Sequence, residues 1–416
     1  MVRYFILLTS LFTISSFSQT TFKALFYNIL NYPTAPPQNR NVILKNILNT
    51  YEPDIFMVSE LETETAANDI VNYSLSEINK NYLKAAFTSN QSNTSTDSNL
   101  QQLLFYNSDY FILDNQQVIT TNIRDINHYT LKLKTNNYQT NPIYLEVFVT
   151  HLKASQGTVN EQKRLEMITE FTNSLNSLSS NSYVILAGDF NFYTSSESGY
   201  HKILNTNNHV IMKDVLNLNN SLQSWHNNYN YHTIHTQATR LDNSEFNGFG
   251  AGGGLDDRFD FIMLSENIIN TSAINYVSNS YKSYGNNGNC FNKRIDDTDC
   301  SGNFSQSLRD DLYNMSDHLP VVLSLESSQT LKATDAVIDN NVRFINGNII
   351  ENKLVFEINK ETHLNNNVFI YNNLGQIMYK KMLKNKRNSI DISSFSKGIY
   401  YLKIEGVHTV LKFIKE

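Results

Sequence analysis

Short apolar runs that end at a polar residue recur along most of the chain. In residues 184–187, four apolar residues stand in a row, followed by Gly188 and then by the polar side chains of Asp189 and Asn191. Such a run predicts a strand that is buried on both faces. Positions two apart in an extended segment point to the same side, so the two polar side chains are expected to share one site. The alternative is an Asx turn that closes the strand, and the run alone does not decide between them.

The same pattern predicts further strands and helices in alternation. Strands are expected at residues 21–29, 54–59, 102–107, 110–113, 129–134, 143–150, 183–187, 258–264 and 321–325. Helices, with apolar residues three and four positions apart, are expected at residues 41–50, 69–79 and 161–175. Several connections are too long for hairpins, which indicates an α/β core with helices packed outside the sheets.

The pattern changes near the C-terminus. Residues 327–340 have the composition of a linker, and residues 341–416 contain only strand-like runs separated by turn residues. These runs are residues 354–358, 367–371, 376–381, 390–392, 399–404 and 410–414. We therefore expect a small all-β sandwich after the α/β domain.

The N-terminus has the features of a secretory signal peptide. Arg3 precedes an apolar stretch from residue 4 to residue 14, and Ser16 and Ser18 place small residues before a cleavage site at Gln19. Residues 1–18 are thus predicted to be removed on export. No later segment of the sequence has the unbroken apolar length of a transmembrane helix, so no membrane-spanning segment is expected.

Length and composition agree with an exported protein of more than one domain. The 416 residues suggest two or three domains, and 40% hydrophobic with 17% charged residues allows a sizeable core under a weakly charged surface. A net charge of −6 argues against a broad basic face for nucleic acid, although not against local, metal-assisted binding. Cys290 and Cys300, ten positions apart in an exported chain, predict a loop-closing disulfide.

Polar residues at the ends of the predicted strands form a chemically coherent set. They are Asn28, Glu60, His151, Asp189, Asn191, Asp260, Asp317 and His318. Carboxylate and amide oxygens suit Mg²⁺ or Mn²⁺, and histidine suits proton transfer near neutral pH. Taken singly, each of these residues has a structural explanation: Asn28 or Asp317 can be a turn residue, and His151 can be a histidine at the edge of a sheet. Together they predict hydrolysis of a phosphate ester.

Six blocks within this set resemble the endonuclease/exonuclease/phosphatase superfamily, which includes pancreatic deoxyribonuclease, apurinic endonucleases and bacterial sphingomyelinases. In the order of that family, the blocks are Phe26-Tyr27-Asn28, Ser59-Glu60, Val149-Thr150-His151-Leu152-Lys153, Gly188-Asp189-Phe190-Asn191, Arg258-Phe259-Asp260-Phe261-Ile262 and Ser316-Asp317-His318-Leu319-Pro320-Val321. The fourth and sixth blocks are the most specific. The resemblance implies a four-layer α/β sandwich, with residues 19–326 as the catalytic domain.

The resemblance also implies how a metal would be held. Glu60 would be the principal metal ligand, assisted by Asn28 and Asp317. The expected cofactor is Mg²⁺ or Mn²⁺, and Ca²⁺ is an alternative as a structural ion.

The remaining site residues would act on the substrate and the attacking water. His151 would contact the phosphate or act as general acid, and Asp189 and Asn191 would position the water and stabilise the transition state. His318, oriented by Asp260, would be a general base or a phosphate clamp.

One departure from the family concerns the support of His151. In the deoxyribonuclease branch a glutamate supports the first histidine, but residues 99–102 contain no carboxylate. One of the two glutamines in that stretch, Gln101 or Gln102, is expected to hold the ring instead, which weakens the assignment as general acid. Tyr106 and Arg124 are candidates for phosphate contact, and each is as readily structural.

The C-terminal module resembles the sorting domain of the type IX secretion system of Bacteroidetes. The resemblance rests on Asn373-Leu374-Gly375-Gln376, Ser396-Lys397-Gly398-Ile399-Tyr400 and Lys412-Phe413-Ile414-Lys415. It implies passage through the outer membrane to the cell surface or the medium, with the secretion machinery as partner. A carbohydrate-binding sandwich is the competing interpretation, but the single tryptophan, Trp225, lies outside this module.

Three functions follow from these observations. The first is a secreted metal-dependent nuclease acting as a monomer on extracellular DNA or RNA, and the second is a sphingomyelinase-like hydrolase of phospholipid or small phosphate esters. The third is a non-catalytic binding protein of the same fold, which the complete set of ligands and histidines argues against. Residues 248–254 are interpreted as a flexible glycine-rich loop near the site, and His232 and His235 as surface or substrate-loop residues.

Overall fold

The structure is a computed structural model that describes residues 20–78, 80–92, 100–216, 224–270, 273–331, 342–345, 347–358, 365–405 and 410–416. The chain divides into two compact units, Met1–Leu331 and Lys332–Glu416. The predicted signal peptide and most of the predicted linker lie outside the described residues. Within the described residues, no helix combines the length and the apolar character that a membrane span requires.

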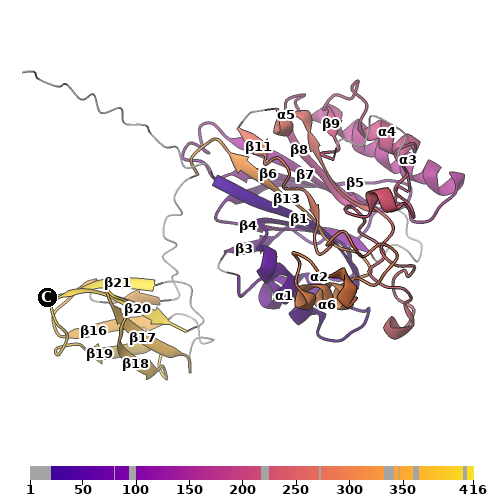
Figure 1. Ribbon diagram of the computed structural model, residues 1–416. Coiled ribbons are helices and arrows are strands. Elements are labelled where there is room, and N and C mark those ends of the chain that lie inside the picture. The colour runs from indigo at the N-terminus through magenta and orange to yellow at the C-terminus, as the bar shows by residue number, and fades with distance from the viewer. Residues whose placement is uncertain are drawn as a thin grey trace, which may run out of the picture. The chain divides into compact units, whose positions relative to one another are not determined.

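Two β-sheets form the centre of the first unit (Figure 1). The first sheet has the order β11-β13-β1-β2-β4-β3, with β12 also paired to β13, and the second has the order β5-β6-β7-β8-β10-β9. The strands of the first sheet are β1 (Thr20–Tyr32), β2 (Ile55–Leu61), β3 (Tyr82–Lys84), β4 (Gln101–Asn107), β11 (Ile274–Tyr276), β12 (Lys282–Ser283) and β13 (Val321–Ser327). Those of the second are β5 (Phe111–Ile119), β6 (Ile126–Leu133), β7 (Ile143–His151), β8 (Tyr183–Asp189), β9 (Met212–Lys213) and β10 (Asp260–Ser265).

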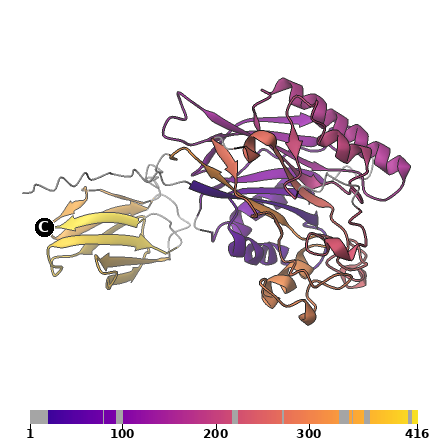
Figure 2. The ribbon, with the colours of Figure 1, turned by 45° about the horizontal axis from the view of Figure 1, so that its top comes forward.

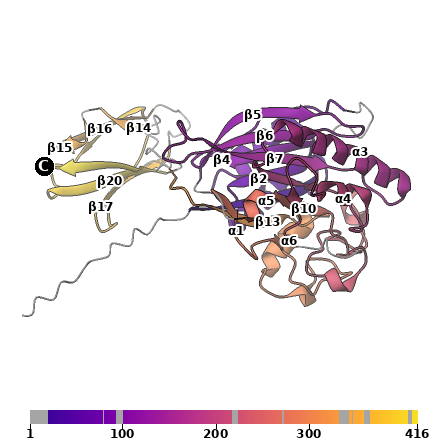
Figure 3. The ribbon, with the colours of Figure 1, turned by 90° about the horizontal axis from the view of Figure 1, so that it is seen from above.

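Helices cover the outer face of each sheet, so the first unit has four layers. On the first sheet lie α1 (Arg40–Tyr51), α2 (Glu64–Asp69) and α6 (Gln306–Met315), and on the second lie α3 (Thr158–Ser174) and α4 (Ser198–Ile203). Figures 2 and 3 show the same layers from two other directions, with α3 lying along the second sheet. The short helix α5 (Glu266–Ile269) follows β10 directly. The predicted four-layer α/β sandwich is confirmed.

Strand β8 shows why the apolar runs are continuous. Ile185 and Ala187 belong to the core that joins the two sheets, whereas Val184 and Leu186 belong to the core under α3, which also contains Phe171. Because successive side chains of a strand point to opposite faces, both faces of β8 must be apolar. The prediction of a strand buried on both sides is confirmed.

Four helices differ from the sequence prediction: the short helices α4 and α5 were not expected, and α2 and α6 differ as follows. The helix expected at residues 69–79 begins earlier, at α2, because the Thr63 side chain accepts a hydrogen bond from a backbone N–H of its first turn, and it continues as a π-helix, Ile70–Ser74. Helix α6 was not predicted, although Ser305 caps it in the same way and its buried residues recur at helical spacing. The helix follows directly after the glycine- and asparagine-rich loop that contains the cysteines, and its helical spacing was therefore overlooked.

The second unit consists of two small sheets. One has the order β14-β16-β19 and the other β15-β21-β20-β17-β18. The strands are β14 (Val342–Phe344), β15 (Ile349–Ile350), β16 (Lys353–Ile358), β17 (Asn367–Asn372), β18 (Ile377–Met382), β19 (Arg387–Asp391), β20 (Gly398–Ile404) and β21 (Val410–Lys415). Residues of both sheets share one apolar core, among them Phe356 and Leu402, which confirms a small all-β sandwich.

A buried ion pair anchors the segment that enters β10. The guanidinium of Arg258 donates to both carboxylate oxygens of Asp214, at 2.7 and 3.0 Å, and lies 4.0 Å from the centroid of the Phe261 ring. The hydroxyl of Tyr200 donates to the same carboxylate at 2.9 Å. Both charged side chains are almost completely buried, so neither can be solvated if the other is removed.

Replacing Asp214 by alanine should therefore lower the free energy of unfolding of the first unit by about 3–5 kcal/mol, because Arg258 would be left buried and unpaired. Trp225 is the single tryptophan and is fully buried in this unit, so its fluorescence during urea unfolding reports on this unit. The control is Lys45→Ala, which removes the exposed pair with Glu77 and should cost at most about 1 kcal/mol. Equal effects of the two variants would contradict the argument.

Candidate active site

Five strands, β1, β2, β7, β8 and β10, bring most of the predicted residues to one edge of the sandwich. The parallel strands β1 and β2 pair regularly as far as Asn28, and Glu60 follows at the irregularity. In the facing sheet, the parallel strands β7 and β8 end with His151 opposite Asp189, and β10 starts with Asp260 opposite Asp189 on its other side. The side-chain nitrogen of Asn28 lies 3.1 Å from Asp189 Oδ2, so the two sheets meet here.

Asn28 links the carboxylates of the two sheets. Its Nδ2 donates to Glu60 Oε1 at 3.0 Å as well as to Asp189, while its Oδ1 accepts from the backbone N–H of Leu30 at 3.0 Å. The amide therefore presents its nitrogen to the carboxylates and uses its oxygen within its own loop. In this orientation Asn28 is a donor to the predicted ligand Glu60.

Glu60 is a largely buried carboxylate, with its side chain 12% exposed, in an unusual backbone conformation. Its φ of 62° lies in the left-handed region, at the point where the pairing of β2 shifts, and its Oε2 accepts from the backbone N–H of Asn31 at 3.0 Å. Burial and the nearby Asp317 carboxylate raise the pKa of Glu60 above its usual range. The raised pKa indicates a place where positive charge is in short supply.

The glycine-rich loop and Gln237 hold Asp317. Asp317 Oδ2 accepts from the backbone N–H of Ala251 at 2.7 Å and from Gln237 Nε2 at 3.0 Å, whereas Oδ1 is buried without a hydrogen-bond partner. Gly250 has a φ of 82°, and a Cβ there would lie 2.9 Å from Asp317 Cγ. The loop thus lies against the site, where the sequence interpretation expected it, and only glycine allows its close approach.

His318 and Asp260 form a buried pair. His318 Nδ1 lies 2.8 Å from Asp260 Oδ2, and Asp260 is fully buried. Burial alone would lower the pKa of His318, but Asp260, Asp189 and Asp317 outweigh it and raise this pKa well above its usual range. The amide nitrogens of Gln237 and Asn28 face Nε2 at 2.6 and 3.5 Å and favour its unprotonated form, so they oppose the carboxylates at this nitrogen.

Asp189 and Asn191 form both a turn and a part of the cluster. The backbone N–H and the Nδ2 of Asn191, whose φ is 52°, donate to Asp189 Oδ1 at 3.1 and 2.8 Å. The Asx turn closes β8 and leaves Asp189 Oδ2 facing Asn28. Burial, together with Asp260 and Glu60, raises the pKa of Asp189 to about 7. The two interpretations of this stretch, an Asx turn and part of a site, are therefore compatible.

His151 contacts the carboxylates with only one ring nitrogen. Its Nε2 lies 3.5 Å from Asp189 Oδ2 and 4.0 Å from Glu60 Oε1, and its buried Nδ1 has no hydrogen-bond partner among the described residues. Neither Gln101 nor Gln102 therefore supports that nitrogen. Burial, followed by the positive charge of Arg124, holds the pKa of His151 well below its usual range. The neutral ring suits hydrogen bonding to a phosphate better than proton donation.

The two tentative phosphate contacts lie in different places. Arg124 is buried behind the strand end and donates to the backbone carbonyls of His151 and Leu152, at 3.5 and 3.2 Å. Tyr106 pairs with Ile55, at the end of β2 opposite to Glu60. The structure thus brings Arg124 to the back of the cluster and leaves Tyr106 outside it.

Two features of the site region were not found in the sequence. Gln237 contacts both Asp317 and His318, but it lies in an irregular segment whose pattern predicts no element. A second group of possible metal ligands, His226, Asp256 and Asp257, has ligand atoms within 4.8 Å of one another. The ligand atoms of Asp189, Asp260 and His318 lie equally close together. In each group a histidine Nδ1 lies 2.8 Å from a carboxylate oxygen, that of His318 from Asp260 and that of His226 from Asp257, so we interpret both as hydrogen-bonded groups.

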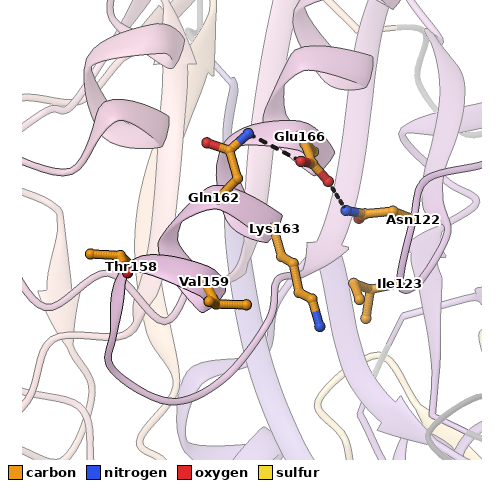
Figure 4. Close-up of a pocket in the computed structure, with 7 residues that line it drawn as sticks. All are labelled: Asn122, Ile123, Thr158, Val159, Gln162, Lys163 and Glu166. Carbon is orange, nitrogen blue, oxygen red and sulfur yellow. Dashed lines mark hydrogen bonds between the residues drawn. The ribbon is translucent and has the colours of Figure 1, made fainter.

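Other predicted features lie around the cluster. Cys290 and Cys300 form the predicted disulfide. A surface pocket of about 460 Å³ lies between residues 122–123 and the start of α3, where Asn122 and Gln162 both hydrogen bond to Glu166 (Figure 4). None of the predicted site residues lines this pocket.

Comparison with known families identifies the second unit. Residues 348–416 match the family described as the secretion system C-terminal sorting domain. The second unit is a sorting domain. It marks the protein for export through the type IX secretion system to the cell surface or the extracellular space, in agreement with the sequence prediction. No curated protein was found to match the chain.

Solved structures are similar to about three quarters of the chain. The human Nocturnin catalytic domain with bound sulfate is 16% identical, with 74% of this chain and 98% of that chain covered and a TM-score of 0.45. TDP2 of D. rerio in complex with a single-strand DNA product is 14% identical, with 74% and 99% covered and a TM-score of 0.46. An endonuclease/exonuclease/phosphatase family protein from Bacteroides thetaiotaomicron is 14% identical, with 75% and 97% covered and a TM-score of 0.44.

His235, expected from the sequence to be a surface or substrate-loop residue, precedes the segment that carries Gln237 and does not lie at the surface. It is fully buried, and its Nε2 lies 2.8 Å from the backbone carbonyl oxygen of Trp225. Burial lowers the pKa of His235 from 6.5 to about 4. The ring is thus neutral in the folded protein, whereas in the unfolded chain it becomes protonated below its usual pKa.

The contribution of His235 to the stability of the folded state should therefore be lost as the pH falls from its usual pKa towards about 4, and should be fully present above that range. Between about pH 7 and about pH 5 the loss should be roughly 2 kcal/mol. His235→Gln keeps an N–H donor but cannot titrate, so its urea-unfolding free energy should fall by less over this interval. The control is His209→Gln: His209 is exposed, and its Nε2 also contacts a backbone carbonyl, at 2.9 Å. An unchanged pH dependence in His235→Gln would contradict the assignment.

Proposed function

We propose that residues 19–326 form a metal-dependent phosphodiester hydrolase of the endonuclease/exonuclease/phosphatase superfamily, exported by the sorting domain. Its proposed substrate is extracellular DNA or RNA. The observation that carries the proposal is the convergence of the six sequence blocks on one buried cluster at the sheet edge, in which Asn28 joins Glu60 to Asp189. A set of structural turn residues would not need to meet in this way.

The donor set fits a hard divalent cation such as Mg²⁺ or Mn²⁺. Asp317 Oδ1 is buried without a partner, and the pKa of Glu60 is raised by burial and by Asp317. Both observations favour a cation between oxygen ligands. Glu60 and Asp317 would hold it, and Asn28 would join them only if its amide turned. When bound, the cation would offset negative charge on the phosphate and on the leaving oxygen.

The proposed roles of the chain's own residues follow from their contacts. Asp189 would accept a hydrogen bond from the attacking water. Asn191 would hold the Asp189 carboxylate in place through two hydrogen bonds to its Oδ1. His318, with its Nδ1 on Asp260, would take up the proton of the water or bind the phosphate. His151, neutral and facing Asp189, would donate a hydrogen bond to the phosphate.

A nuclease is favoured over a sphingomyelinase by the surface of the first unit. A membrane-active enzyme needs a group of exposed aromatic or large apolar side chains. Among the described residues, the large exposed apolar side chains of this unit include the tyrosines Tyr73 and Tyr229 but neither tryptophan nor phenylalanine. Lipid and small phosphate esters therefore remain the second candidate substrates.

Hydrolysis of plasmid DNA, RNA, sphingomyelin and a chromogenic phosphodiester, each with Mg²⁺ and with EDTA, tests the proposal. Nucleic acid and the chromogenic ester should be cleaved only in the presence of the metal. Asp189→Ala and His318→Ala should each lower the rate by more than about a hundredfold, because water positioning and proton transfer would be lost.

The control variant is His209→Ala, which alters an exposed histidine outside the cluster and should retain the rate. Near-normal activity of either active-site variant would refute its proposed role. Turnover in EDTA would refute the metal-dependent mechanism, and cleavage of sphingomyelin alone would select the second candidate.

A further inference from the structure

A short irregular segment, residues 236–239, crosses the two sequence blocks that supply Asp260 and His318. The Thr236 hydroxyl oxygen accepts from the backbone N–H of Asp260 at 3.2 Å, and the Thr236 carbonyl accepts from the N–H of Leu319 at 2.7 Å. Thr239 donates through its hydroxyl to the Ser316 carbonyl at 2.6 Å. The segment therefore fixes the backbones of both blocks relative to each other.

Gln237 is the residue of this segment whose side chain enters the cluster. Its Nε2 lies 3.0 Å from Asp317 Oδ2 and 2.6 Å from His318 Nε2. An ionised carboxylate accepts hydrogen bonds and cannot donate them, so Asp317 determines that the nitrogen of the amide, and not its oxygen, faces the site. As a result, His318 Nε2 also meets a donor.

The backbone of Gln237 is anchored independently of its side chain. Its N–H donates to the Asp257 carbonyl at 3.0 Å, and its own carbonyl accepts from the N–H groups of Asp256 and Asp257 at 2.9 and 2.7 Å. The side chain is only partly buried. A change of the amide should therefore leave the segment in place.

We propose that Gln237 is a positioning residue that sets the placement of His318 Nε2 relative to the Asp317 carboxylate. This inference rests on the proposed function, which gives those two residues their tasks. A single NH₂ group bridges them, so neither can turn without losing a hydrogen bond. Displacement of a reacting group by about 1 Å can cost about a hundredfold in rate.

The test is Gln237→Glu, which keeps the size of the side chain and replaces its donor with an acceptor beside Asp317. In the metal-free protein, the ring resonances of His318, assigned by their loss in His318→Ala, should shift in the NMR spectrum. With the chromogenic phosphodiester, kcat should fall by about ten- to a hundredfold while KM changes by less than about threefold. The urea-unfolding midpoint should stay close to that of the unaltered protein.

The matched control is Gln156→Glu, because Gln156 Nε2 lies 3.0 Å from Nε2 of another histidine, His226. This variant should shift the ring resonances of His226 and leave kcat within about twofold. The proposal is overturned if Gln237→Glu leaves the His318 resonances in place, or if they shift and kcat does not change. If the unaltered protein hydrolyses no phosphodiester, the proposed function fails, and the NMR shift alone decides whether Gln237 positions the ring.

Discussion

The close packing of buried carboxylates at one edge of the sandwich is the constraint on which the site depends. Asp189, Asp260 and Asp317 are buried and Glu60 is largely buried, so water screens these carboxylates little. Burial is the largest cause of the raised pKa of both Glu60 and Asp189. Amide nitrogens, backbone N–H groups and His318 compensate part of this charge. The negative charge that they leave uncompensated is the feature that a bound cation would offset.

The apolar layers make this arrangement possible, and they are also what the sequence reveals best. A strand buried on both faces must be apolar throughout, so β8 and the polar residues at its end could be recognised without a structure. The orientation of Asn28 could not, because the backbone N–H of Leu30 determines it. Gln237 was equally hidden: its segment forms isolated bridges and has no periodicity that a pattern could detect.

The two units divide the properties of the protein between them. All the predicted metal ligands and catalytic residues lie in the first unit, and the sorting domain has an apolar core of its own. Each unit buries its own hydrophobic surface, so neither depends on core residues of the other. Residues 348–416 explain where the protein goes, and their match is independent of the chemistry proposed for residues 19–326.

The direct pairing of Asp189 with Asp260 across β8 and β10 has a consequence for folding accuracy. A slip of one residue between these strands would exchange their inward and outward faces, burying polar groups in the core and turning Asp260 away from His318. The same register thus determines both the packing of the sheet and the contact between Asp260 and His318. The hydrolysis proposed for this site would therefore require the correct strand alignment, so an activity assay would also report on the correct assembly of the two strands.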